Sequence, residues 1–251
     1  MKKKTLLTLG KCALISMMMT ACSGNEELKT LACHVHPELT FSCESDTRAI
    51  VASFVNGSKI GIMVTDKGTT NEYGGDTRNL NICYTLQGND NWAASYDTSL
   101  TNAQANVYGY YPYGSDCSTG KVAMTNGIDY MYTVQPSVIN LQNPAAEIRL
   151  SHAMALLRFE FDSSLGTVKS VRVRNIPSYG TLDVFTGKVT ASAQKTNMDI
   201  LKTDVEFSEG LLVVPGNKID VMVYTDNGNF VWKPDQVAES GKLYNIRLSA
   251  D

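Results

Sequence analysis

The sequence predicts an all-β protein of two tandem β-sandwich domains, which follow a signal peptide and a tether. Near the middle of the chain, Leu157, Phe159 and Phe161 alternate with charged residues, which is the period of a strand with one buried face. Two Asn-Gly pairs, Asn56-Gly57 and Asn227-Gly228, lie between β-rich runs and predict hairpins with type I′ turns. No convincing helical pattern exceeds two turns. Many short strands separated by turn signals are typical of sandwiches.

Residues 1–21 have the features of a lipoprotein signal peptide. Met1–Lys4 is basic, and Thr5–Thr20 is an apolar run too short and too polar for a comfortable membrane span. Small residues then precede Cys22, which we expect to carry the lipid. The alternative is an ordinary signal peptide whose cleavage site merely neighbours a cysteine. Two or three acyl chains would anchor the mature chain stably to a membrane.

Residues 22–48 are predicted to form a lipid-anchored tether with one removable, strand-like piece, Glu38–Ser42. The tether also holds four residues of types that bind metals, Cys33, His34, His36 and Cys43. Their spacing does not follow a common zinc pattern, so we expect no metal and no cofactor. Disulfides are permitted in an oxidising compartment, and the pairing of Cys33, Cys43, Cys83 and Cys117 stays open.

The first sandwich domain is predicted over residues 49–145. Its expected strands are Ala49–Val55, Lys59–Val64, Asn81–Leu86, Lys121–Met124 and Asp129–Val134. Between the third and fourth lies a tyrosine-rich strand with Tyr108, Tyr110, Tyr111 and Tyr113. Pro112 confines that strand to an edge, or ends it, because proline has no N–H to donate. Gln135–Ala145, with two prolines, is expected to connect the domains.

The second sandwich domain is predicted over residues 146–251. Its expected strands include Glu147–His152, the alternating Leu157–Phe161 run, the two sides of the Thr186-Gly187 turn, and an apolar run within Gly210–Gly216. Val171 and Val173 are expected to face one way, and Arg172 and Arg174 the other. The last run alternates again, with Tyr244, Ile246 and Leu248 on one face.

The mature chain is mildly acidic. The whole sequence has 22 basic and 25 acidic residues, and four of the basic residues lie in the leader, which contains no acid. With 18 basic against 25 acidic residues, the formal charge after the leader is removed is −7. An exported, acidic chain without a basic cluster is not expected to bind nucleic acid.

No enzymatic activity is expected. The sequence has no nucleophile elbow, zinc-protease helix, phosphate loop or dinucleotide turn. His152 is the only histidine outside the tether, and its neighbours form no recognisable constellation, so we expect a structural role for it. A catalytic pair of carboxylates stays an open alternative, because any two acidic residues can lie close together in the folded chain.

Six pieces of the chain, by their order and spacing, resemble the fimbrillin-like (Bacteroidetes type V) pilins. They are TRAIVASF, VYGYYPY, YMYT, IRLSHAMALLRFEF, GLLVVPG and GKLYNIRL. Together they cover most of the mature chain. The resemblance implies transthyretin-like sandwiches, export to the outer membrane as a lipoprotein, and a structural role in a surface fimbria that supports adhesion.

The resemblance also implies assembly by strand exchange. In this family an arginine-specific protease releases an N-terminal strand from a groove in its own sandwich, and a neighbour's C-terminal segment then fills the groove. The matching residues here are Arg48-Ala49 for cleavage, and Leu39 and Phe41 for the core-facing side of the plug strand. The candidate donor is the last strand, with Tyr244, Ile246 and Leu248. If that strand does not leave, an anchor, tip or accessory role becomes an alternative to a stalk role.

A second hypothesis is a monomeric surface lipoprotein that binds glycans through exposed tyrosines. Under the first hypothesis the partners are other pilin subunits, the outer membrane through the lipid, the arginine-specific protease, and a host glycan or protein. Polymerisation after proteolysis would distinguish the two.

Overall fold

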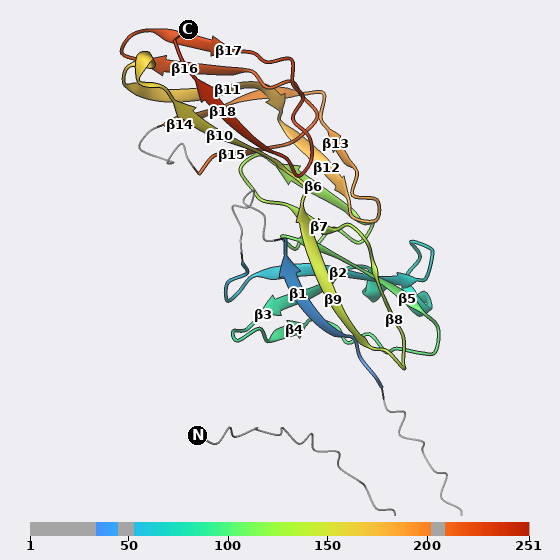
Figure 1. Ribbon diagram of the computed structural model, residues 1–251. Helices are drawn as coiled ribbons and strands as arrows, with labels where there is room; N and C mark the ends of the chain where they lie inside the picture. The colour runs from blue at the N-terminus through green and yellow to red at the C-terminus, as the bar shows by residue number, and fades with distance from the viewer. Residues whose placement is uncertain (1–33, 45–52, 202–208, 251) are drawn as a thin grey trace, which may run out of the picture. The chain divides into compact units, whose positions relative to one another are not determined.

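The computed structural model describes residues 34–44, 53–201 and 209–250, and every regular element in these ranges is a β-strand or a short 3-10 turn (Figure 1). This confirms the all-β prediction. The strands are β1 (Glu38–Cys43), β2 (Lys59–Asp66), β3 (Ile82–Leu86), β4 (Trp92–Ala94), β5 (Ala105–Tyr111), β6 (Lys121–Thr125), β7 (Met131–Thr133), β8 (Ser137–Ile139), β9 (Ala145–His152), β10 (Ala155–Phe161), β11 (Val168–Pro177), β12 (Tyr179–Asp183), β13 (Val189–Ala191), β14 (Lys195–Leu201), β15 (Leu211–Val213), β16 (Val221–Thr225), β17 (Asn229–Trp232) and β18 (Leu243–Leu248). The 3-10 turns are η1 (Tyr73–Gly75), η2 (Thr77–Leu80) and η3 (Ser163–Leu165).

The first sheet has eight strands in the order β1-β9-β7-β5-β2-β3-β4, and β8 also pairs with β5. β1 and β4 stand at the two ends of this order. Nevertheless, the ring centroids of Phe41 in β1 and Trp92 in β4 are only 4.7 Å apart. The sheet therefore curls until its ends face each other across a shared core. That first core includes Ile60, Ile62, Val64, Val107, Ile148 and Leu150.

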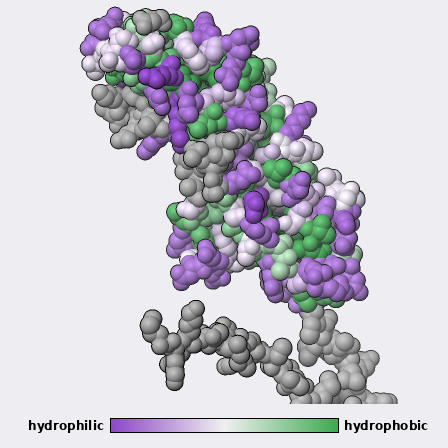
Figure 2. Space-filling model, viewed as in Figure 1, coloured by the Kyte–Doolittle hydropathy of each residue, from purple (hydrophilic) through white to green (hydrophobic). Residues whose placement is uncertain are grey.

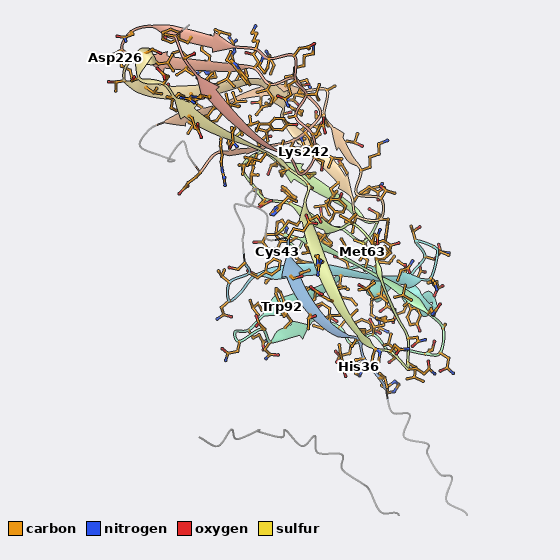
Figure 3. All side chains as sticks on the ribbon, viewed as in Figure 1. His36, Cys43, Met63, Trp92, Asp226 and Lys242 are labelled. Atoms are coloured by element: carbon orange, nitrogen blue, oxygen red, sulfur yellow. The ribbon has the colours of Figure 1, made fainter. Side chains whose placement is uncertain are left out.

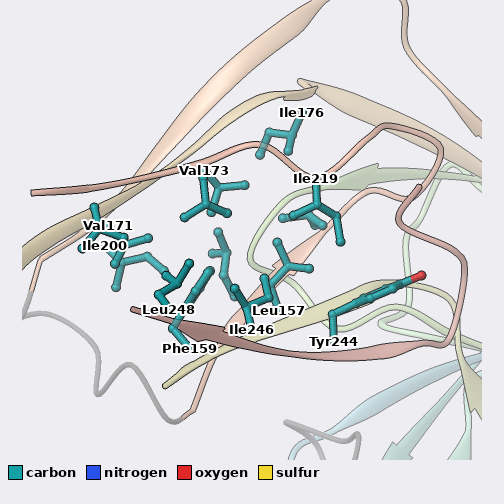
Figure 4. Packing of buried hydrophobic residues seen from close by; sticks show 14 of the residues in the cluster. Leu157, Phe159, Val171, Val173, Ile176, Ile200, Ile219, Tyr244, Ile246 and Leu248 are labelled. Atoms are coloured by element: carbon teal, nitrogen blue, oxygen red, sulfur yellow. The ribbon is translucent and has the colours of Figure 1, made fainter. Parts of the chain in front are cut away.

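The C-terminal half contains a three-stranded sheet, β15-β10-β18, and a four-stranded sheet, β14-β11-β16-β17. Leu157 and Phe159 are buried while Glu160 is exposed, which confirms the alternation predicted for β10. Figure 4 shows side chains of both sheets directed toward one another, among them Leu157, Phe159, Val171, Val173, Ile246 and Leu248. Two sheets that share one core are the arrangement of a β-sandwich.

A third sheet joins strands from both halves of the chain. Its order is β13-β12-β6, and Val122 of β6 lies opposite Leu182 of β12. A separate cluster of buried residues surrounds this junction and includes Met63, Tyr110, Met124, Leu156, Leu182 and Val214. The two halves are therefore linked by a strand ladder and by a core, in addition to the chain itself.

The sequence division at residues 145/146 does not coincide with a change of sheet. Gln135–Ala145, expected to be a connection, contains β8, which pairs with β5. β9 belongs to the first sheet, because its buried residues Ile148 and Leu150 face the first core. The chain enters the second half after β9, at β10. The division into two domains at 145/146 stays a prediction.

The two Asn-Gly pairs behave differently. Asn227-Gly228 joins the antiparallel strands β16 and β17, which confirms that hairpin. Asn56-Gly57 forms a turn that leads into β2, but Ser53–Val55 ahead of it is not a strand, and residues 49–52 lie outside the described ranges. The expected type I′ geometry is wrong at both, because only the glycine of each pair has positive φ. Asn89-Asp90, between β3 and β4, has positive φ at two successive positions instead.

We expect Gly61→Ala to lower the free energy of unfolding by about 2–3 kcal/mol. Gly61 lies opposite Tyr110, and a Cβ on Gly61 would stand 2.0 Å from Cε1 of that ring. The ring cannot move freely, because it is fully buried and its hydroxyl donates to Asn81 Oδ1 at 2.7 Å. Urea unfolding would measure the loss.

Gly57→Ala is the matched control. Gly57 has φ +88° and no atom within 4 Å of its would-be Cβ, so only the backbone cost of about 1 kcal/mol applies. Equal losses in the two variants would show that Tyr110 is not held in place.

Candidate functional site

β1, the strand predicted to be removable, lies at the edge of the first sheet. It pairs in parallel with β9, with Leu39 opposite Ala146 and Phe41 opposite Ile148. The other pairs described in this sheet are antiparallel. Since β9 is the one strand paired with β1 in the described ranges, only one side of β1 takes part in a ladder.

The side chains of β1 alternate between core and solvent. Leu39 and Phe41 are partly buried and pack against the first core, whereas Thr40 between them is exposed. The Phe41 ring lies between other aromatic rings, with centroids 4.7 Å from Trp92 and 5.4 Å from Tyr84. β1 thus closes one side of the first core with its apolar face.

Three residues of this site escaped the sequence analysis. Cys43 continues the inward face of β1, and Val35 packs on the same core ahead of the strand. Period-2 spacing from Phe41 could have indicated Cys43. Phe54 is the third, with its ring centroid 5.5 Å from that of Trp92. No local pattern predicts this contact, because it depends on how the sheet curls.

Polar contacts fasten both ends of the β1 segment. Ahead of the strand, His36 Nδ1 donates to the backbone oxygen of Thr98 at 3.0 Å. Near the strand's end, Ser42 Oγ donates to Glu147 Oε1 on β9 at 2.7 Å. That hydrogen bond, with a smaller contribution from the charge of Arg149, lowers the pKa of Glu147. These contacts help to fix the register of β1 on β9.

A cavity of about 280 Å³ opens beside the end of β1. Its lining includes Phe41, Cys43, Phe54, Leu86, Asp90 and Trp92. Burial, together with the nearby charge of Asp129, raises the pKa of the Cys43 thiol to about 11. The cavity thus has both aromatic and polar walls, and it leaves room beside Phe41 for a different side chain.

The candidate metal residues of the tether are not brought together. His36 and Cys43 lie at opposite ends of β1 (Figure 3). His34 Nδ1 is hydrogen-bonded to Ser99 Oγ at 3.1 Å. The described ranges contain no group of three or more His, Cys, Asp or Glu residues that could hold a metal. Cys43, Cys83 and Cys117 are free thiols, and Cys33 lies outside the described residues.

The predicted modification sites lie outside the described residues. This applies to Cys22, Arg48 and Ala49, so lipidation and cleavage there stay predictions. The predicted cut lies between β1 and Phe54, and would separate the strand from the rest of the chain. In the described ranges, no helix combines the length and apolar character needed to cross a bilayer.

The candidate donor strand is an integral part of the second core. β18 pairs in parallel with β10. Tyr244, Ile246 and Leu248 are 9%, 1% and 5% exposed, and Figure 4 shows them directed into the cluster of buried residues. β18 thus repeats on β10 the arrangement of β1 on β9, with deeper burial.

The tyrosines mainly serve packing. Of the 12 in the sequence, Tyr179 alone is exposed, at 52%, and the other 11 are buried or partly buried. The face shown in Figure 2 carries hydrophobic residues in separate areas among hydrophilic ones. The structure therefore offers no exposed tyrosine platform on which sugar rings could stack.

His152 is buried beside a carboxylate. Its Nδ1 lies 2.9 Å from Asp129 Oδ1, and both side chains are almost inaccessible. Its Nε2 has no hydrogen-bond partner among the described residues. No described residue places a nucleophile within hydrogen-bond reach of that nitrogen, and the structural role of His152 stays a prediction.

Comparisons with known proteins point in one direction. A family model described as fimbrillin-like matches residues 47–251. A putative cell adhesion protein from Bacteroides uniformis has a similar structure, with a TM-score of 0.65, 18% sequence identity, and coverage of 86% of this chain and 94% of that chain. A putative cell adhesion protein from Bacteroides ovatus has a TM-score of 0.62 and 19% sequence identity, with coverage of 86% of this chain and 93% of that chain. A fimbrial assembly protein from Parabacteroides distasonis has a TM-score of 0.51 and 8% sequence identity, with coverage of 85% of this chain and 90% of that chain. No curated protein matches significantly.

Phe41→Ala should loosen β1 selectively. The ring is partly buried between Trp92 and Tyr84, so we expect a loss of about 2–3 kcal/mol in the free energy of unfolding. Hydrogen exchange should become faster at the amides of β1 and stay unchanged in β18. Thr40→Ala, on the exposed face of the same strand, should change stability by less than about 0.5 kcal/mol. Equal effects of the two substitutions would contradict the packing role of Phe41.

Proposed function

The chain belongs to the fimbrillin-like family, and we propose that it is a structural subunit of a surface fimbria that assembles by strand exchange after proteolysis. The observation that carries the proposal is β1, an edge strand whose apolar face closes the first core. Loss of β1 would leave the edge of β9 unpaired and an apolar slot open. An incoming strand can satisfy both, by backbone pairing and by alternate side chains.

The burial of the two parallel edge strands supports β1, rather than β18, as the strand that exchanges. In β1, three partly buried side chains at roughly 1–2 kcal/mol each contribute about 3–6 kcal/mol. In β18, three almost fully buried side chains at roughly 1.5–3 kcal/mol each contribute about 5–9 kcal/mol, and they complete the second core. β1 is therefore the easier strand to release. We assign it the role of plug and keep β18 in place.

Cleavage after Arg48 would convert β1 from an intramolecular strand into a bound peptide. Before the cut, β1 is covalently linked to its own groove. If it detaches, it remains at a high effective concentration there and binds again. After the cut it is held only by noncovalent contacts, so an incoming strand can replace it permanently. Phe54, which follows the cut, would stay with the subunit and keep lining the slot beside Trp92.

Membership of the family supports a location at the cell surface and a role in adhesion. Of the three similar structures reported above, two are described as putative cell adhesion proteins and one as a fimbrial assembly protein. At such low sequence identity, the similarity to these structures supports the fold alone. The proposed role in adhesion therefore rests on membership of the family. The glycan hypothesis based on exposed tyrosines is not favoured, because Tyr179 is the only exposed one.

Lipidation of Cys22 is expected to anchor the precursor in the outer membrane. Cells that express the protein should incorporate a fatty-acid probe into it, and Cys22→Ala should remove the label. Cys12→Ala, which changes the leader cysteine, is the control and should leave labelling intact. Equal labelling of the Cys22→Ala protein would refute the lipid anchor.

Trimming after Arg48 should make β1 exchangeable. The test uses the mature chain with Cys22→Ala, an arginine-specific protease, and a fluorescent peptide with the sequence of residues 34–44. Trimmed protein should take up the peptide slowly, seen as a rise in fluorescence anisotropy, and should form larger species with partner pilins in size-exclusion chromatography. Uncut Arg48→Ala protein should remain monomeric and exclude the peptide.

The matched control peptide carries Leu39→Asp and Phe41→Asp, and it should not enter, because charges cannot occupy the apolar slot. Alkylation gives a local readout. A thiol pKa near 11 instead of 9.0 makes the thiolate of Cys43 about 100-fold scarcer at pH 8. With an added peptide that carries Cys43→Ser, iodoacetamide should therefore label the protein's own Cys43 quickly only once β1 has left. Uptake of both peptides, or of neither, would overturn the strand-exchange proposal.

A further inference from the structure

A second cavity, of about 350 Å³, lies in the C-terminal half and has no part in strand exchange. Six of its eight lining residues are polar or charged, namely Asn175, Asn217, Lys218, Asp220, Lys233 and Asp235. Apolar atoms of these side chains and of Ile219 and Pro234 nevertheless form the larger part of its surface. This volume falls at the lower end of the range for small-molecule sites. The cavity could hold a group of about the size of one sugar ring.

Strand pairing brings its walls together. The hairpin of β16 and β17 places Val221 opposite Trp232, so Asp220 before β16 and Lys233 after β17 are neighbours (Figure 1). The third wall comes from β11, whose register on β14 is interrupted between Val173 and Ile176. Asn175, inside this bulge, has φ +54°, a conformation that few non-glycine residues adopt. Bulges re-aim side chains, and this one turns Asn175 toward Asp220.

Asp220 is the fixed floor of the cavity. The residue is only 8% exposed, and its Oδ1 accepts from Arg174 Nη2 at 2.6 Å and Nε at 3.0 Å. Its Oδ2 accepts from Asn175 Nδ2 at 3.2 Å. Lys233 Nζ is 3.8 Å from that Oδ2, beyond direct hydrogen-bond distance. Arg174 holds the carboxylate by direct hydrogen bonds, whereas the exposed ammonium of Lys233 forms only a longer ion pair with it and keeps its N–H donors for a ligand.

The local charge is opposite to that of the whole chain. Among the lining residues and their direct polar partners there are four cations, Arg174, Lys195, Lys218 and Lys233, and two carboxylates, Asp220 and Asp235. The whole chain has a formal charge of −3. A concave region with an excess of positive charge on an acidic protein attracts a small anion.

We propose that this cavity binds a sugar acid, a monosaccharide unit that carries a carboxylate. Lys233 would hold the carboxylate. The side-chain amides of Asn175 and Asn217 and the outer carboxylate of Asp235 already make hydrogen bonds within the protein, so their remaining N–H groups and lone pairs would meet the hydroxyl groups as donors and acceptors. Pro234 adds an apolar rim for the C–H face of the ring. A neutral sugar would leave the excess charge uncompensated, and a simple anion would not use the amides.

Titration calorimetry or saturation-transfer NMR on the mature chain with Cys22→Ala tests this directly. The probes are glucuronate, N-acetylneuraminate, glucose and inorganic phosphate. At least one of the two sugar acids should bind, more tightly than glucose or phosphate and less tightly as salt rises. Lys233→Ala should weaken that binding about tenfold or more, the usual effect of losing one charge-assisted hydrogen bond.

Lys188→Ala is the matched control, because Lys188 is an exposed lysine that lines a different polar hollow, with Thr181 and Asp183. It should leave binding unchanged. Three results would overturn the proposal: neither sugar acid binds, glucose or phosphate binds as tightly, or both lysine variants bind equally. Binding should also be the same in uncut Arg48→Ala protein, so its outcome is separate from that of strand exchange.

Discussion

The parallel pairing of an edge strand with each of two consecutive strands is the constraint on which the rest of the structure depends. β9 and β10 follow one another with only Ala153 and Met154 between them, and both linking residues are buried. β9 holds β1, the first described strand, and β10 holds β18, the last. The link itself is fixed, since Ala153 N donates to Tyr130 O and Met154 O accepts from Gly241 N. One short segment thus places both ends of the described chain in their sheets.

The two edge strands share this geometry but differ in what their removal would destroy. β18 supplies three of the deeply buried side chains of the second core, whose other members come from both facing sheets. β1 adds a partly buried wall to a first core that already has its own buried interior. If a strand supplies the centre of a core, its removal unfolds the domain. If a strand only covers a core, the domain can stay folded after the strand leaves and can then accept another strand. Under the strand-exchange proposal, this difference in burial, rather than the pairing geometry, is the reason to assign the exchange to β1.

The sequence predicted the local features well and the long-range ones poorly, for a physical reason. The alternation in β10 and the hairpin at Asn227-Gly228 depend on residues that are neighbours in the sequence, so they could be recognised directly. The pairing of β6 with β12 joins strands far apart in the chain and leaves no local pattern. The polar cavity was missed for the same reason. Asp220 stands between Ile219 and Val221, and nothing in these neighbouring residues indicates that the bulge of β11 lies beside its carboxylate.

The two sites also occupy different elements, which has a consequence for adhesion. The plug site uses β1, β9 and the first core, whereas the polar cavity uses the bulge of β11 and the ends of β16 and β17. No residue belongs to both, so filling one need not disturb the other. A fibre of such subunits would display one cavity per subunit. Binding that is weak at a single cavity would then be strengthened by repetition, because each further contact to a polymeric ligand forms at a high effective concentration. Assembly by strand exchange would in this way add avidity to the weak binding at each single cavity.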